Sequence, residues 1–122
     1  MASREQFPAV FLQLNGLLTR FAPHLLVTDD RPAGYSLNTP FAEQYKKELF
    51  FGAVQIKKNY VSYYLMPVYV FPDLLGDLSP RLRKRMQGKS CFNFTELDDE
   101  TIAELARLTE RGFERFQQAQ LV

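Results

Sequence analysis

The sequence predicts an α+β fold in which an N-terminal and a C-terminal helix pack on one face of a mostly antiparallel sheet of about five strands. Apolar residues recur at helical spacing over residues 7–21 and again over residues 102–116. Between these two segments, aromatic and β-branched residues gather in short runs typical of strands. The chain lacks the strand–helix alternation of a parallel sheet. Because 122 residues is the length of one ordinary domain, we expect residues 1–122 to form a single unit.

The charges of the chain balance overall but are unevenly distributed. Fifteen basic and fourteen acidic residues give a net charge of +1, which argues against bulk nucleic-acid binding. Residues 46–95 carry nine basic and three acidic groups, whereas residues 96–122 carry three and seven. This asymmetry predicts a polar molecule that pairs with itself or holds an anion on one side.

The sequence favours a cytoplasmic protein that does not span a membrane. The single cysteine, Cys91, cannot form an internal disulfide, which fits a reducing compartment. The first residues lack the basic and apolar regions of a secretory signal. The most apolar stretch, residues 61–72, is too short for a spanning helix, which needs about twenty apolar residues.

The first third of the chain predicts a helix followed by short strands. The helix is expected to begin near Phe7 and to stop at Pro23, because proline cannot continue a helix. Residues 25–28 then predict a strand. A long polar connector follows over residues 29–47, inside which residues 35–37 add a further strand.

Residues 49–57 and 60–69 predict a β-hairpin whose register follows from a two-residue turn at Lys58 and Asn59. One face of this hairpin is apolar and carries the pairs Ile56–Val61, Val54–Tyr63, Gly52–Leu65 and Phe50–Pro67. The other face is mixed and carries the pairs Lys57–Tyr60, Gln55–Ser62, Ala53–Tyr64 and Phe51–Met66. We therefore expect Val54 and Ile56 to be buried and Lys57 to be exposed.

The second half of the chain predicts two short helices, a last strand and a long final helix. Residues 72–75 predict one helical turn. The next helix has Ser79 as its N-cap and Gly88 just past its end. Residues 90–95 alternate between apolar and polar side chains, and Asp98 begins the final helix.

The mixed face of the hairpin and the basic run over residues 81–89 form a candidate ligand site. Tyrosine rings beside polar groups are the usual make-up of such a site, and Lys and Arg hold anions. Tyr69 is expected on the same face. The candidate ligand-binding residues are Gln55, Lys57, Tyr60, Ser62, Tyr64, Arg85 and Lys89. A sheet face covered by the connector or a dimer partner, and a solvated helix face, explain the same residues without a ligand.

A cluster of carboxylates at the start of the final helix is an alternative site. Hard cations prefer oxygen ligands, and the candidate ligands are Asp98, Asp99, Glu100 and Glu104. Helix capping and a solvated face explain these carboxylates without a metal, and we favour that interpretation. One histidine and one cysteine cannot form a zinc cluster, and no nucleophilic triad can be argued. The sequence therefore favours a protein that is not an enzyme and requires no cofactor, with iron as the alternative.

Two segments resemble the YdhG-like family of small bacterial proteins. They are Lys57-Lys58-Asn59-Tyr60-Val61-Ser62, at the hairpin turn, and Gly88-Lys89-Ser90-Cys91-Phe92-Asn93-Phe94, between a basic short helix and the final helix. The resemblance covers about residues 46–116. It implies an α+β domain, largely of unknown function, and some members are described as frataxin-like iron chaperones.

Three functions follow from these observations. The leading hypothesis is non-enzymatic binding of a small anionic or amphipathic ligand at the mixed face and the basic helix. The second is an iron-binding chaperone that uses the carboxylates of the final helix. The third is a homodimeric interaction protein, whose 14% aromatic residues supply the interface.

Overall fold

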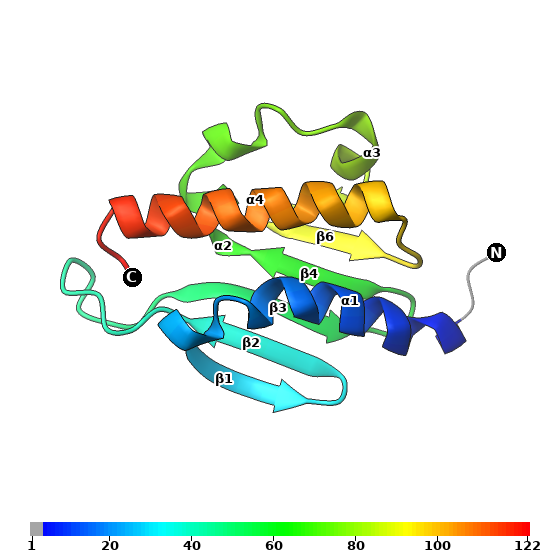
Figure 1. Cartoon of the computed structure of the whole chain (residues 1–122), viewed down its shortest axis with the longest axis horizontal. Coiled ribbons are helices and arrows are strands. Elements are labelled where there is room, and N and C mark those ends of the chain that lie inside the picture. Colours follow the sequence, from blue (N-terminus) through cyan, green and yellow to red (C-terminus); the bar gives the residue numbers. More distant parts are fainter. Residues whose placement is uncertain (1–3) are drawn as a thin grey trace.

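A computed structural model describes residues 4–122, which form a six-stranded antiparallel sheet with helices on one face (Figure 1). The strands are β1 (Leu26–Arg31), β2 (Gly34–Asn38), β3 (Phe50–Ile56), β4 (Val61–Leu65), β5 (Met86–Gln87) and β6 (Cys91–Phe94), in the order β1-β2-β3-β4-β6-β5. The helices are η1 (Arg4–Gln6), α1 (Phe7–Thr19), η2 (Ala22–His24), α2 (Met66–Val70), η3 (Pro72–Leu75), α3 (Pro80–Arg83) and α4 (Asp99–Gln118). The α+β prediction is confirmed, and the short β5 is the additional strand.

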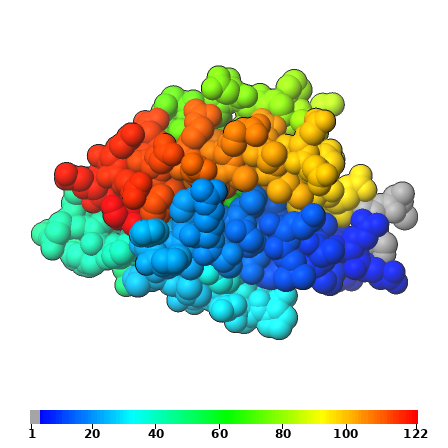
Figure 2. All heavy atoms as spheres, viewed as in Figure 1, coloured from blue at the N-terminus to red at the C-terminus, as the bar shows by residue number. Residues whose placement is uncertain are grey.

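The helices α1 and α4 cover one face of the sheet. They cross it side by side in Figure 1, and their side chains close over most of it in Figure 2. The rings of Phe21 and Phe113 stack with centroids 4.7 Å apart where the two helical segments meet. From the sheet, the hydroxyl of Tyr63 lies 2.6 Å from Thr109 Oγ1 on α4. Because side chains alternate along a strand, the neighbours of Tyr63 point to the opposite face.

The central hairpin has the predicted register near its turn but ends earlier than predicted. Ile56 pairs with Val61 and Gly52 pairs with Leu65, as the two-residue turn requires. Val54 is fully buried, Ile56 is half-buried and Lys57 is exposed. The predicted pairs Phe50–Pro67 and Phe51–Met66 are wrong, because β4 ends at Leu65 and a helix begins at Met66. Proline lacks a backbone N–H, so it fits the first turn of a helix better than a paired strand.

A bulge in β3 brings a further aromatic ring into the core. Leu37 pairs with Gly52 and Asn38 pairs with Phe50, so Phe51 is an extra residue in the ladder. Its ring is fully buried, with the Phe113 and Phe116 rings in edge contact at 5.9 Å and 5.7 Å. The bulge therefore turns toward α4 a side chain that simple alternation places on the other face.

The predicted connector holds more structure than its composition suggests. The strand β1 continues through Asp29 to Arg31, whose guanidinium donates two hydrogen bonds to the Asp29 carboxylate at 2.7 Å and 2.8 Å. After a tight turn, β2 begins at Gly34. The remaining loop, residues 39–49, is closed at its base, where Thr39 Oγ1 accepts a hydrogen bond from the Leu49 N–H. We call residues 39–49 the connector loop.

Two of the predicted helix caps are present, and the predicted glycine cap is not. Ser79 Oγ accepts from the Leu82 N–H at 3.1 Å, and the Asp98 carboxylate accepts from the Thr101 N–H at 2.7 Å. The helix α3 ends well before Gly88, because the chain leaves it to form β5. Gly88 has a φ of +78° and makes the turn between β5 and β6, a conformation that glycine adopts without strain.

Candidate functional site

The mixed face of the hairpin lies on the side of the sheet opposite α1 and α4, and a polar network crosses it. Asn93 Oδ1 accepts hydrogen bonds from Ser62 Oγ at 2.7 Å and from Cys91 Sγ at 3.4 Å. Asn93 Nδ2 donates to Gln87 Oε1 at 2.6 Å. The structure places five of the candidate ligand-binding residues on this face or at its turn: Gln55, Lys57, Tyr60, Ser62 and Tyr64.

The thiol of Cys91 lies in the middle of this network. Burial raises the pKa of the Cys91 thiol, while hydrogen bonding with Ser62 and Tyr64 and the positive charge of Lys57 act in the opposite direction. A thiol with a raised pKa is protonated at neutral pH and is a poor nucleophile. The environment therefore fits a structural cysteine. The alternation over residues 90–95, which puts Cys91 and Asn93 on one face, is the sequence signal for this network.

The two candidate basic residues outside the hairpin line two other hollows. Lys89 lies beside helix α2, with its Nζ 5.9 Å from the centroid of the Tyr69 ring. Arg85 lines a polar hollow with Arg81 and Asp98. Neither hollow includes the candidate residues of the hairpin. The seven candidate ligand-binding residues are therefore spread over three separate places and do not form one site.

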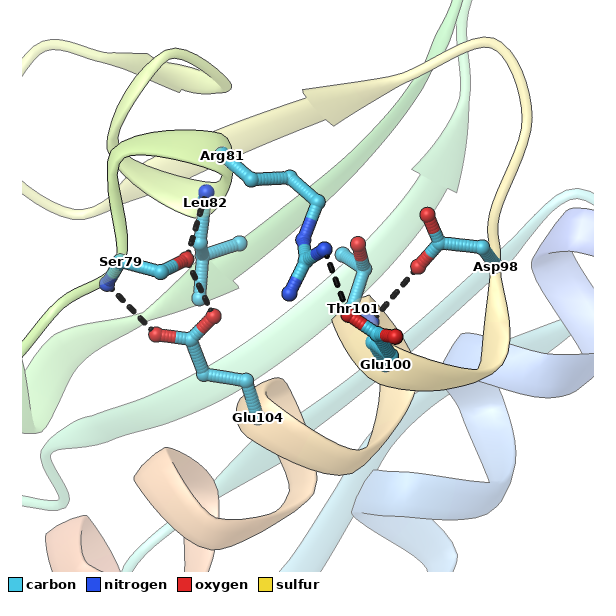
Figure 3. Close-up of polar contacts among 7 residues, drawn as sticks. All are labelled: Ser79, Arg81, Leu82, Asp98, Glu100, Thr101 and Glu104. Carbon is cyan, nitrogen blue, oxygen red and sulfur yellow. Dashed lines mark hydrogen bonds and ion pairs between the residues drawn. The ribbon is translucent and has the colours of Figure 1, made fainter.

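The candidate metal ligands at the start of α4 either make contacts with other residues or are exposed; Figure 3 shows Asp98, Glu100 and Glu104. Asp98 caps the helix through the Thr101 N–H, and hydrogen bonding with the Thr101 side chain and then with this backbone N–H lowers the pKa of the Asp98 carboxyl. Glu100 Oε2 accepts from Arg81 Nη1 at 2.7 Å, and both of these side chains are exposed. Asp99 is exposed in the first helical turn, where an acidic side chain favours the positive end of the helix dipole.

Glu104 holds α3 against α4. Its two carboxylate oxygens accept hydrogen bonds from Ser79, one from the backbone N–H at 2.7 Å and one from the hydroxyl at 2.6 Å (Figure 3). Within residues 4–122, no three His, Cys, Asp or Glu side chains are grouped so that they could hold one metal ion. The structure thus does not bring Asp98, Asp99, Glu100 and Glu104 around a common ion.

An apolar surface that the sequence reading missed lies on helix α2. Pro67 and Val68 face inward, whereas Tyr69 and Val70 keep 54% and 39% of their surface exposed. Tyr69, which was expected on the mixed hairpin face, therefore points outward from a helix. Gly112 of α4 makes this packing feasible, because a Cβ there would lie 2.8 Å from the Pro67 Cβ.

Tyr69 stands between two apolar hollows. The first, of about 300 Å³, lies between α2, β3, the end of α4 and the connector loop, and Lys47 and Glu48 line it beside Phe50 and Met66. We call it the connector groove. The second, of about 540 Å³, lies between α2, η3 and β5 and contains Lys89; its apolar walls are Val68, Pro72, Leu75 and Met86. We call it the β5 groove.

Several exposed apolar side chains gather at the connector groove, and others lie elsewhere on the described chain. Three of its exposed large side chains, Tyr45, Tyr69 and Val70, line the connector groove. Grouped exposed apolar side chains mark binding surfaces more often than scattered ones do. The sequence feature that could have indicated helix α2 is Pro67, because a proline directly after a strand-like run is typical of the first turn of a helix.

The fold and these grooves define a small α+β protein with helices on one face of its sheet. Comparison with family models, curated proteins and solved structures found no match to the chain. The resemblance to the YdhG-like family therefore stays a prediction. No helix within residues 4–122 has the length and apolar character to cross a membrane.

Proposed function

We propose that this protein is a non-enzymatic binding domain for a small amphipathic anion, and that the ligand lies against Tyr69 in the connector and β5 grooves. The observation that carries the proposal is the Tyr69 ring, which is half-exposed, is shared by both grooves and lies under the Lys89 ammonium. An apolar cleft with a few placed polar groups is the usual form of a small-molecule site.

The two lysines account for the charge of the ligand. Lys47 lies at the connector groove and Lys89 at the β5 groove, so a chain laid against Tyr69 has a cation available in each. Glu48 beside Lys47 weakens the attraction for an anion there, which makes Lys89 the stronger anchor. Fully burying a large apolar side chain contributes about 1.5–3 kcal/mol, so covering the exposed half of Tyr69 contributes up to about 1.5 kcal/mol, or about tenfold in affinity.

Titration with decanoate, a ten-carbon carboxylate, tests the proposal by calorimetry. Tyr69→Ala is expected to weaken binding about tenfold, since it removes the wall common to both grooves. Leu12→Ala is the matched control, because Leu12 is 68% exposed on α1 and lines neither groove. Equal affinities for wild type and Tyr69→Ala would contradict the proposal.

A further inference from the structure

A separate hollow lies on the side of α4 that faces η3 and α3. It measures about 260 Å³, and Leu74, Leu78 and Leu108 form its apolar wall. Arg107 and Arg111 of α4 also line it. Residues four apart lie on the same face of a helix, so the two guanidinium groups belong to one rim.

Two guanidinium groups and two carboxylates, those of Asp77 and Glu104, line this hollow, but neither arginine makes a close ion pair with either carboxylate. Arg107 makes no hydrogen bond or ion pair with another residue of the described chain, residues 4–122. Arg111 has its nearest carboxylate at 4.0 Å, on Asp77, whose side chain is 89% exposed. Glu104 also lines the hollow; the neutral Ser79 N–H and hydroxyl occupy its oxygens, so it does not pair with the arginines, and its negative charge limits how tightly an anion binds.

The next arginine along α4 shows what a satisfied guanidinium looks like on this helix. Arg115 donates to both Asp73 oxygens, at 2.7 Å and 3.3 Å, and lies 4.4 Å from the centroid of the Phe71 ring. Arg107 and Arg111 lack such a fork of hydrogen bonds. A planar guanidinium is suited to bidentate binding of a carboxylate or phosphate, and two of them on one rim are suited to a single anionic group.

We propose that Arg107 and Arg111 bind the anionic group of a compact organic anion, a carboxylate or a phosphate, whose apolar body lies against Leu74, Leu78 and Leu108. The volume lies below the range of about 300–1,000 Å³ typical of drug-sized ligands, so the ligand is compact. Asp77 competes with the ligand for Arg111. The site does not depend on the grooves at Tyr69.

Titration with phenyl phosphate and with benzoate, at low salt, tests this site, and benzyl alcohol is the uncharged comparison. We expect wild type to bind at least one anion more tightly than the alcohol. Arg107→Gln and Arg111→Gln should each weaken that binding at least tenfold. Asp77→Asn should tighten it, because it removes the competing carboxylate. Preference for one anion identifies the head group.

Two control variants separate this site from its surroundings. Arg81→Gln should leave the affinity unchanged, because the Arg81 guanidinium is held by Glu100 outside the hollow. Tyr69→Ala should also leave it unchanged, so failure of this site and failure of the Tyr69 grooves are distinguishable. Circular dichroism verifies that each variant folds. Absence of anion binding by wild type, equal affinity in Arg107→Gln, or weaker binding in Asp77→Asn would overturn the proposal.

Discussion

The Glu104 carboxylate accepts two hydrogen bonds from Ser79, one from its backbone and one from its side chain, across 25 positions of sequence. Ser79 Oγ in turn accepts from the Leu82 N–H at the start of α3. A single carboxylate of α4 therefore fixes the cap of another helix. Leu82 behind it is fully buried, so the same contact seats α3 against the core.

Replacement of Glu104 by alanine should destabilise the protein. Both Ser79 donors lose their charged acceptor. A hydrogen bond to a charged group contributes about 1.5–3 kcal/mol to stability, and the Ser79 donors regain part of this from water in the variant. We expect the free energy of unfolding in urea to fall by about 1–3 kcal/mol in total. Glu100→Ala is the control. Its exposed ion pair with Arg81 should contribute under about 1 kcal/mol. Equal losses in the two variants would contradict this role for Glu104.

The two helical glycines should respond to alanine with opposite signs. A Cβ at Gly16 meets nothing within 4 Å, so Gly16→Ala should stabilise the protein by about 0.5–1 kcal/mol. A Cβ at Gly112 would press on Pro67, and Gly112→Ala should cost about 1–3 kcal/mol. Thermal unfolding of both variants measures the difference. A stabilised Gly112→Ala would show that α2 does not depend on this close contact.

Tyr63 should make the protein sensitive to alkali. Burial raises the pKa of the Tyr63 hydroxyl well above its ordinary value of 10.0, and the hydrogen bond with Thr109 opposes this only in part. The unfolded chain loses that proton above about pH 10 while the folded chain keeps it, so stability falls as pH rises. Tyr63→Phe should cost about 1 kcal/mol at neutral pH and show a shallower decline above pH 10. If the stability of Tyr63→Phe falls above pH 10 as steeply as that of wild type, the Tyr63 hydroxyl is not the source of the alkaline sensitivity.

The Asp98 cap should contribute to acid sensitivity. Hydrogen bonding with the Thr101 side chain and with the Thr101 N–H lowers the pKa of the Asp98 carboxyl below its ordinary value of 3.8. This contribution is present above about pH 3.8 and is lost as pH falls through the lower folded pKa. Asp98→Asn keeps a good cap without the charge, so its stability should depend less on pH in that range. Urea unfolding between pH 2 and 5 measures this, and parallel curves for wild type and variant would refute it.

The long helices and the centre of the hairpin were predictable because each shows its own periodicity. Phe7 to Phe21 form one apolar stripe, and the Lys58–Asn59 turn determines the pairing of Ile56 with Val61. The strand β1 was underestimated, since an edge strand exposed on both faces has no alternation to detect. The run of β-branched and aromatic residues after Pro67 favours a strand, but packing against Gly112 selects a helix.

The candidate grooves were beyond the sequence because their walls come from distant segments. The connector groove is formed by the connector loop, α2 and the end of α4, and local periodicity carries no information about which distant segments come together.

The uneven distribution of charge was predictable from the sequence, but the ion pairs that these charges form were not. The acidic Asp73 of the basic middle pairs with Arg115 of the acidic final helix.

Chemical-shift mapping with decanoate distinguishes the Tyr69 grooves from the mixed hairpin face as the ligand site. We expect the backbone amide signals that move with ligand concentration to come from residues 45–50, 66–72 and 86–89. In Tyr69→Ala the same shifts should require about tenfold more decanoate. Shifts confined to residues 53–64 and 91–93, on the mixed face, would show that the ligand does not bind at Tyr69.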